Sequence, residues 1–233
     1  MRLHWLQHAD FEDLGCIAPA LAAGGHEVHA TRLYAGELPP GPEAYDGLIV
    51  MGGPMNIYEY DAHPWLRDEK AAIRAAVDAG RRVLGICLGA QLVADVLGAP
   101  TTRNGHSEIG WFELRLSEEG ERSPMFAGFP QAFTAFHWHG DTFAIPAGSR
   151  SLMASEACAN QAYALRTDSG AQVAGIQFHL EVTAANARDW FQHEQPAPAR
   201  YVQSSARILG ELDHFAQNNR LMLTLLDHWL RAA

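Results

Sequence analysis

Strand-like apolar segments alternate with amphipathic helical segments through the first hundred residues of this 233-residue chain. The clearest instance lies at residues 82–97, where a short apolar segment passes straight into a helical pattern with Leu92, Val93 and Val96 on one side. Repeated strand–helix–strand order with almost wholly apolar strands is typical of a parallel sheet that helices cover on both faces. The sequence therefore predicts an α/β fold.

The elements of this parallel half are placed by their hydrophobic pattern and by the glycines and prolines between them. Strands are expected at residues 2–7, 26–33, 46–51 and 82–86. Helices are expected at residues 11–23, from Pro64 to Gly80, and from the end of the fourth strand to Gly98. We assign this arrangement to the flavodoxin-like class of open sheets, mostly parallel, with helices on both faces.

The pattern changes from Glu108 onward, where short strands follow one another with turns rich in Gly, Pro, Asp or Ser. These strands are expected at residues 111–116, 133–138, 151–157, 161–166 and 172–179. Residues 168–170 (Asp-Ser-Gly) are expected to form a hairpin turn between the last two. We therefore expect antiparallel strands to be added to the parallel core.

Helices are expected again near the C-terminus. Thr183 is placed to cap one that runs through His193, and the Pro-containing segment 195–198 then breaks the chain. Two amphipathic helices follow, whose apolar faces are formed by Ile208, Leu212 and Phe215 and by Met222, Leu225, Leu226, Trp229 and Leu230. We predict one domain at residues 1–195 and a helical extension at residues 196–233 packed on it. A homodimer contact is the alternative use of these faces.

Composition excludes several classes of protein. With 17 Lys and Arg against 27 Asp and Glu, the net charge is −10, and no basic run is present, which argues against binding to nucleic acid or an anionic membrane. Cys16, Cys87 and Cys158 are odd in number and far apart, which suits a reducing compartment rather than a disulfide framework. No apolar run approaches a membrane span, and residues 1–10 lack the core of a signal peptide, so we expect a cytoplasmic protein.

A possible nucleophile stands between the apolar strand and the helix at residues 82–97. Residues 85–89 (Gly-Ile-Cys-Leu-Gly) have the pattern of a nucleophile elbow, with Cys87 where hydrolases usually carry serine. The small flanking residues allow a tight turn, and the start of a helix favours the thiolate form. The alternative is a buried core cysteine beside two packing glycines.

A possible base lies in residues 177–181 (Gln-Phe-His-Leu-Glu). Because side chains alternate along a strand, His179 and Glu181 are expected to point the same way, so that the carboxylate orients the imidazole. A third segment, Gly52-Gly53-Pro54, follows the strand at 46–51 and can direct backbone N–H groups at a developing oxyanion. Each segment alone has an ordinary structural explanation.

All three segments follow the carboxyl end of a predicted parallel strand. Open α/β sheets bind their ligands at that edge. If the strands are neighbours, nucleophile, base and oxyanion donors face one crevice. The sequence therefore predicts a Cys-His-Glu site formed by Cys87, His179 and Glu181.

Together these segments resemble the class I (triad-type) glutamine amidotransferases, and within that family the stand-alone GMP-synthase-like members. The matching elements are residues 52–54 (Gly-Gly-Pro), 85–91 (Gly-Ile-Cys-Leu-Gly-Ala-Gln), 138–141 (Trp-His-Gly-Asp) and 178–181 (Phe-His-Leu-Glu). Residues 45–56 also match a stretch typical of the stand-alone members. Leu180 departs from the usual proline; by strand alternation it faces away from the site.

The resemblance implies roles for individual residues. Cys87 would attack the side-chain amide of glutamine, His179 would transfer the proton, and Glu181 would hold His179. Backbone N–H groups of Gly53 and Leu88 would form the oxyanion hole. The substrate contacts would come from Gly52, Gln91, Trp138, His139, Gly140 and Asp141. No cofactor is implied. Asp141 competes with Glu181 as the group that orients His179.

The function expected from this resemblance is a glutaminase that forms a γ-glutamyl thioester and supplies ammonia to a separate acceptor or synthetase, since no ATP-pyrophosphatase domain accompanies it in the sequence. A γ-glutamyl peptidase or hydrolase with the same triad is the alternative. A third hypothesis is a binding or regulatory protein without turnover, which the intact triad disfavours. His137 and His139 form a possible metal pair, but no third ligand has suitable spacing, so no metal is expected.

Overall fold

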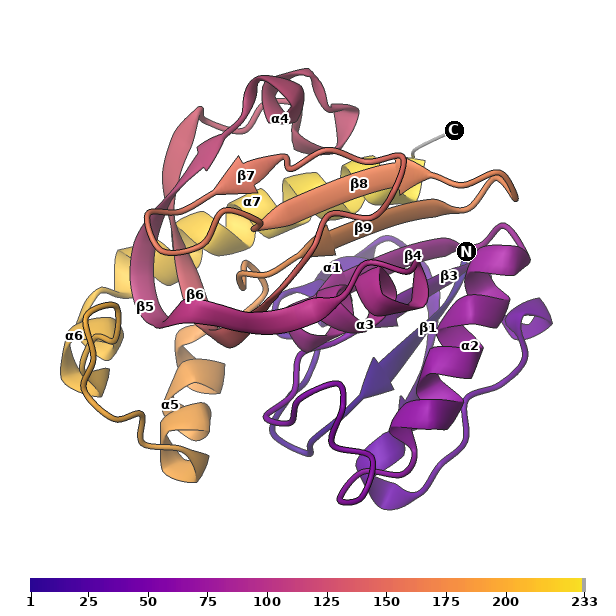
Figure 1. Cartoon of the computed structure of the whole chain (residues 1–233), viewed down its shortest axis with the longest axis horizontal. Coiled ribbons are helices and arrows are strands. Elements are labelled where there is room, and N and C mark those ends of the chain that lie inside the picture. Colours follow the sequence, from indigo (N-terminus) through magenta and orange to yellow (C-terminus); the bar gives the residue numbers. More distant parts are fainter. Residues whose placement is uncertain (232–233) are drawn as a thin grey trace.

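The alternating segments of the N-terminal half form one side of a nine-stranded mixed sheet, seen in a computed structural model that describes residues 1–231 (Figure 1). The strand order is β2-β1-β3-β4-β9-β8-β7-β5-β6. The strands are β1 (Arg2–Gln7), β2 (Glu27–Arg32), β3 (Gly47–Val50), β4 (Arg82–Ile86), β5 (Thr101–Leu116), β6 (Ala132–Phe143), β7 (Met153–Ala154), β8 (Ala162–Arg166) and β9 (Gln172–Ile176). The predicted α/β open sheet is confirmed.

Strands β2, β1, β3, β4 and β9 pair in parallel, and β9, β8, β7, β5 and β6 pair antiparallel. Strand β4 lies between β3 and β9, in register from Leu48↔Val83 to Ile86↔Ile176. The segments that follow β3, β4 and β9 therefore leave the sheet at the same edge. This edge carries the three motifs that the sequence singles out.

Helices cover both faces of the sheet (Figure 1). They are α1 (Ile17–Ala23), α2 (Leu66–Asp78), α3 (Leu88–Val96), α4 (Glu118–Arg122), α5 (Ala184–His193), α6 (Ser205–Gly210) and α7 (Leu212–Arg231). Apolar residues of α2 and α3 pack with Leu48 and Val50 on one face, while α1 and α7 pack with Leu3 and Ile49 on the other. Because side chains alternate along β1 and β3, each of these strands contributes apolar residues to the cores on both faces of the sheet.

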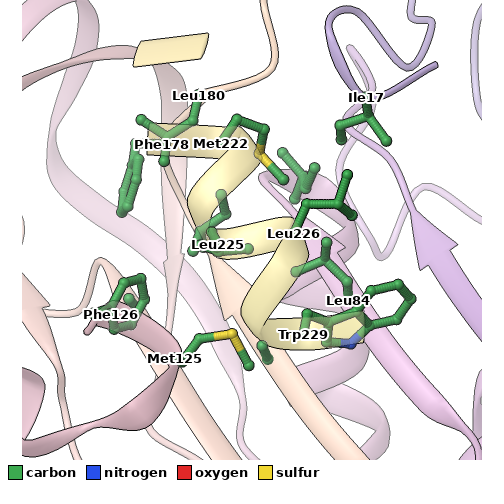
Figure 2. Packing of buried hydrophobic residues seen from close by; sticks show 14 of the residues in the cluster. Ile17, Leu84, Met125, Phe126, Phe178, Leu180, Met222, Leu225, Leu226 and Trp229 are labelled. Atoms are coloured by element: carbon green, nitrogen blue, oxygen red, sulfur yellow. The ribbon is translucent and has the colours of Figure 1, made fainter. Parts of the chain in front are cut away.

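Helix α7 contributes its apolar side to the main core (Figure 2). Met222, Leu225 and Trp229 are fully buried, and they face Leu84 of β4 and Phe178 beyond β9. Each such side chain contributes about 1.5–3 kcal/mol by leaving water. The helix therefore packs on the sheet, whereas the division of the chain into a domain at residues 1–195 and an extension at residues 196–233 stays a prediction.

The predicted helix at residues 11–23 is too long, because only Ile17–Ala23 is helical. Gly15 has a φ of +50°, which is incompatible with a right-handed helix through this residue. A Cβ at this position would overlap the carbonyl oxygen of Glu181. The chain from His8 to Gly15 instead forms a loop that brings Phe11 and Glu12 to the motif-bearing edge.

Other boundaries also differ from the predictions. Strands β5 and β6 are longer than expected, and β6 includes residues 138–141. Of the strand predicted at 151–157, only Met153–Ala154 is present, because Ser155 bonds Cys158 in a tight turn. Leu212 and Phe215 belong to the long helix α7 rather than to the preceding helix. Thr183 caps α5 as predicted, with a reciprocal bond to Asn186.

Candidate active site

Cys87 occupies the turn between β4 and α3. Among residues 1–231 it is the only non-glycine residue with a positive φ, at φ 52° and ψ −110°. Such backbone strain persists only where the surroundings enforce it, and it concentrates at functional sites. Gly89 permits the turn, because a Cβ there would overlap the carbonyl oxygen of Val50 on β3. The predicted strand–turn–helix geometry is present.

The thiol of Cys87 is buried, with 6% of the residue exposed. Its Sγ lies 3.6 Å from the carbonyl oxygen of Trp138, and Nε2 of Gln177 donates to Sγ over 3.6 Å. The backbone N–H of Cys87 bonds the carbonyl of Ile176, the last residue of β9. The turn is thereby joined to the segment that carries His179.

His179 and Glu181 form a buried pair beside Cys87. Nδ1 of His179 lies 2.7 Å from Oε1 of Glu181. Burial alone would lower the pKa of His179, but the charges of Glu181 and Cys87 and the hydrogen bonds with them outweigh burial and raise it well above its usual range. The edge of Trp190 on α5 packs against the imidazole at a centroid distance of 5.0 Å. His179 is therefore held as a charged group in contact with both partners.

The basis for predicting this pair needs correction. Strand β9 ends at Ile176, so residues 177–181 are not part of a regular strand. Instead, the N–H of His179 bonds the carbonyl of Phe136 on β6, which fixes the segment from the side. Leu180 is fully buried in the main core, pointing away from the pair as predicted. The proximity of His179 and Glu181 is real, although alternation along a strand does not cause it.

Gly52 and Gly53 follow β3 and lie against the same centre. A Cβ on Gly52 would lie 3.2 Å from Cε1 of His179 and 3.7 Å from Cβ of Cys87. A Cβ on Gly53 would lie 2.9 Å from a side-chain methyl of Leu88. The structure thus brings both predicted oxyanion donors, Gly53 and Leu88, next to Cys87.

A cleft of about 630 Å³ opens over these residues. Cys87, His179, Gly53 and Leu88 line it. The other lining residues are Phe11, Glu12, Pro54, Met55, Asn56, Gln91, Ser107, Ile109, Trp138, His139, Gly140, Asp141, Trp190, His193 and Glu194. Within the part of the chain that the structure describes, the lining includes three carboxylates and no Lys or Arg. Such a cleft favours a substrate that presents an amine.

The predicted substrate contacts line the cleft, except Gly52, which is not among the lining residues. Gln91 donates to the carbonyl of Asp141 over 3.3 Å and to the side chain of Gln177 over 3.1 Å. The Asp141 carboxylate accepts from the Tyr58 hydroxyl at 3.0 Å. Glu181, not Asp141, contacts His179, so the geometry favours Glu181 as the orienting group.

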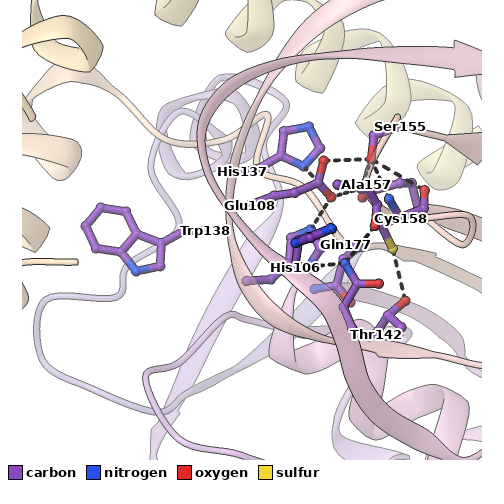
Figure 3. Close-up of polar contacts among 12 residues, drawn as sticks. His106, Glu108, His137, Trp138, Thr142, Ser155, Ala157, Cys158 and Gln177 are labelled. Atoms are coloured by element: carbon purple, nitrogen blue, oxygen red, sulfur yellow. Dashed lines mark hydrogen bonds and ion pairs between the residues drawn. The ribbon is translucent and has the colours of Figure 1, made fainter. Parts of the chain in front are cut away.

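His139 belongs to a polar network around Glu108 and Ser155, two residues that are labelled in Figure 3. Its Nε2 lies 3.1 Å from Oε2 of Glu108, while Ser155 and Gln161 donate to the two oxygens of that carboxylate. Burial alone would raise the pKa of Glu108, but His139 and His137 lower it. Trp138 projects the opposite way, toward the cleft (Figure 3).

Glu108 also supplies the third potential metal ligand that spacing in the sequence did not reveal. One ligand atom each from Glu108, His137 and His139 lies within 4.8 Å of the others, all buried. Burial lowers the pKa of His137 to about 3, so its ring is neutral. The Glu108 carboxylate is already engaged by His139, Ser155 and Gln161.

Sequence reasoning missed Glu12. It lies in the loop that was predicted to be helical, lines the cleft and is 7% exposed. Burial raises the pKa of Glu12 to about 7, against the opposing charge of His179. No motif contains this residue, so only the path of the loop reveals it.

This α/β sheet, with a strained cysteine at the strand–helix turn and a His-Glu pair beside it, has counterparts among known proteins. The sequence pattern of the family "Glutamine amidotransferase class-I" matches residues 17–193. The chain belongs to the class I glutamine amidotransferases.

Individual relatives agree with this family. The glutamine amidotransferase-like protein YfeJ of Salmonella typhimurium is 34% identical over 97% of this chain and 96% of its own. GMP synthase of Streptococcus mutans is 34% identical over 58% of this chain, which corresponds to 25% of that enzyme. A glutamine amidotransferase structure from Thermotoga maritima, 28% identical, superimposes with a TM-score of 0.87 over 100% of this chain and 99% of its own.

Across residues 1–231, no helix combines the length and apolar character that crossing a membrane requires.

Proposed function

We propose that this protein hydrolyses the side-chain amide of glutamine and supplies the ammonia to a separate acceptor. The observation that carries the proposal is that Cys87 and His179 line one cleft beside Gly53 and Leu88, with Glu181 in contact with His179. Membership of the class I family and the similarity to GMP synthase support the same chemistry.

In this proposal the Cys87 thiolate attacks the γ-carbonyl carbon of glutamine, and the electron pair of the carbonyl moves to oxygen. Backbone N–H groups of Gly53 and Leu88 donate to that oxyanion; one such donor is typically worth about 3 kcal/mol. The His179 imidazolium protonates the departing nitrogen, so ammonia leaves and a γ-glutamyl thioester remains on Cys87.

The second half of the reaction regenerates the enzyme. Neutral His179 takes a proton from water, and the resulting hydroxide attacks the thioester carbonyl through a second tetrahedral intermediate. The Cys87 thiolate leaves, and glutamate is released. Glu181 holds the ring and stabilises the imidazolium form of His179, as its 2.7 Å contact with Nδ1 favours. Gln91 and residues 138–141 are assigned to the α-amino and α-carboxylate end of the substrate.

Cleavage of a larger γ-glutamyl amide is a second candidate, favoured by the size of the cleft. A volume of about 630 Å³ falls in the range of sites that enclose drug-sized ligands. In that reaction an amine or peptide, rather than ammonia, leaves after protonation by His179. The thioester and its hydrolysis are unchanged.

The test is release of ammonia from glutamine by the purified chain, with Cys87→Ala beside it and a γ-glutamyl anilide as second substrate. Ammonia release that the variant lacks supports the glutaminase. Turnover of the anilide alone, lost in the variant, supports the γ-glutamyl hydrolase. Absence of both reactions, together with no thioester on Cys87 by mass spectrometry, would reject the proposal.

A further inference from the structure

A second buried histidine–glutamate pair lies behind the cleft, outside the proposed mechanism. Nε2 of His8, the residue after β1, is 2.6 Å from Oε1 of Glu69 in the first turn of α2. Neither side chain is exposed to solvent. A fully buried ionic pair has a high desolvation cost, so its retention invites a functional explanation.

The other ring nitrogen of His8 contacts the backbone of the glycine segment. Nδ1 lies 2.7 Å from the carbonyl oxygen of Gly52. A carbonyl oxygen only accepts, so Nδ1 carries a hydrogen and donates it. Burial alone would lower the pKa of His8, but Glu69 and the bond to Gly52 outweigh burial and raise it. The ring therefore donates on both sides.

The carbonyl that His8 holds belongs to the same peptide unit as the N–H of Gly53. The peptide is trans, because no cis peptide bond occurs within residues 1–231. In a trans peptide the carbonyl and the N–H point in opposite directions. Fixing the Gly52 carbonyl on His8 thus directs the Gly53 N–H away from His8.

This peptide joins two glycines, whose backbone adopts many conformations, so the glycines themselves do little to fix its orientation. A donor that carries charge forms a stronger bond to the carbonyl than a neutral donor does. Trp65 stacks on the His8 ring at a centroid distance of 5.7 Å and an interplanar angle of 28°, which fixes the direction of that donor.

We propose that His8 and Glu69 are positioning residues that lock the Gly52–Gly53 peptide with its N–H in the oxyanion hole. This inference rests on the proposed function, because it concerns the same reaction. The lock has a consequence for regulation: the oxyanion hole is assembled within this chain and needs no partner protein to turn the peptide. Hydrogen bonding to the Gly52 carbonyl also polarises the peptide, which strengthens Gly53 as a donor.

The test separates reactions that form an oxyanion from one that does not. Acylation of Cys87 by a γ-glutamyl anilide passes through a tetrahedral oxyanion, whereas alkylation of Cys87 by iodoacetamide displaces iodide without one. His8→Phe keeps a ring in the cavity but removes both donors. We expect kcat/KM for the anilide to fall roughly 10- to 100-fold, less than the 10²–10³-fold cost of deleting a donor itself. Alkylation of Cys87 should change by no more than about threefold.

Two further variants test the role of the hydrogen bond. His8→Asn places an amide N–H₂ near the position of Nδ1 and should recover most of the activity lost in His8→Phe. Glu69→Gln keeps a hydrogen-bonding partner for His8 but removes its charge, and it should lower kcat more than it raises KM. His4→Phe is the matched control: His4 is a buried histidine on β1 whose ring bonds Thr31, away from the cleft. It should leave both reactions of Cys87 unchanged.

Several outcomes would overturn the lock. Anilide turnover within threefold of wild type in His8→Phe would do so, as would an equal loss of acylation and alkylation, which indicates general damage to the site. If His8→Phe does not fold, full acylation activity in Glu69→Gln would overturn the proposal instead. If the wild-type chain forms no acyl-enzyme with either substrate while Cys87 still alkylates, the proposed function itself is wrong. This result is distinguishable from failure of the His8–Glu69 proposal, in which the wild-type chain does form the acyl-enzyme.

Discussion

The carboxylate of Glu181 lies 2.7 Å from Nδ1 of His179, and both side chains are almost completely buried. This contact fixes the ring so that Nε2 remains for Cys87 and the substrate. Together with Cys87, Glu181 also raises the pKa of the ring, which favours the charged imidazolium. In the proposed mechanism, the pair holds the proton that a leaving amine requires.

Glu181→Gln is expected to reduce turnover sharply. The amide is similar in size, so the fold should persist, but it removes the negative charge that stabilises the imidazolium. Comparable replacements of the orienting acid in a catalytic triad lower kcat by about 10⁴-fold, and we expect 10²–10⁴-fold here with KM within a few fold. Steady-state kinetics with glutamine and a γ-glutamyl anilide measure this.

Asp141→Asn serves as the matched acid-to-amide control. Its carboxylate accepts a hydrogen bond from Tyr58, whereas the orienting contact to His179 comes from Glu181. We expect this variant to raise KM while kcat stays within about tenfold. A loss of kcat in Asp141→Asn with an unchanged rate in Glu181→Gln would transfer the orienting role to Asp141.

Cys87 should react selectively with a diazoketone analogue of glutamine. Burial, together with the nearby charge of Glu181, raises the pKa of Cys16 to about 12, and burial raises the pKa of Cys158. Both therefore hold little thiolate at pH 8, and the cleft lies over Cys87 alone among the three. Peptide mass spectrometry should find one adduct per chain, on Cys87. Equal labelling of all three cysteines would contradict this assignment.

Gly89→Ala should destabilise the protein strongly. An alanine Cβ would overlap the backbone oxygen of Val50, and neither backbone can move without disturbing the β3–β4 pairing. We expect the free energy of unfolding to fall by about 2–4 kcal/mol, measured by urea titration. Gly210→Ala at the end of α6 is the control, since a Cβ there meets nothing within 4 Å, and its effect should stay within about 1 kcal/mol. Equal effects of the two replacements would show that the turn tolerates a side chain.

Much of the parallel half follows from local sequence. The apolar strand at 82–86, Cys87 and the helix after it form one motif with a single structural solution, so its prediction matched β4 and α3 closely. The same holds for Thr183, whose side chain and spacing to Asn186 define a helix start. Such features depend on neighbours within a few residues.

Features set by distant contacts could not be predicted in this way. The loop at residues 8–15 has helical composition, yet Gly15 packs against the backbone of Glu181 far along the chain and prevents a helix. The sequence therefore did not predict the places of Glu12, His8 and Glu69 in the site, because no spacing in the sequence links these residues to Gly52. Glu108 likewise meets His139 only through the pairing of β5 with β6.

Glu12 should make stability depend on pH near neutrality. Its pKa is about 7 in the folded protein against an ordinary value of 4.5, with burial as the main cause. Between these pH values the native state holds the proton more tightly than the unfolded chain. The contribution of Glu12 to stability is therefore most favourable below pH 4.5 and is lost as pH rises through 7, a change of about 3 kcal/mol.

Glu12→Gln removes this titration, so its stability relative to wild type should rise by about 3 kcal/mol between pH 4.5 and pH 8. Urea titrations of both proteins at several pH values measure the difference. Glu121→Gln, the same exchange at an exposed position on α4, controls for the loss of one carboxylate. A Glu12→Gln difference that stays constant across this range would mean that Glu12 ionises in the folded protein as it does in the unfolded chain. In that case the charge of His179 would have to compensate fully for burial.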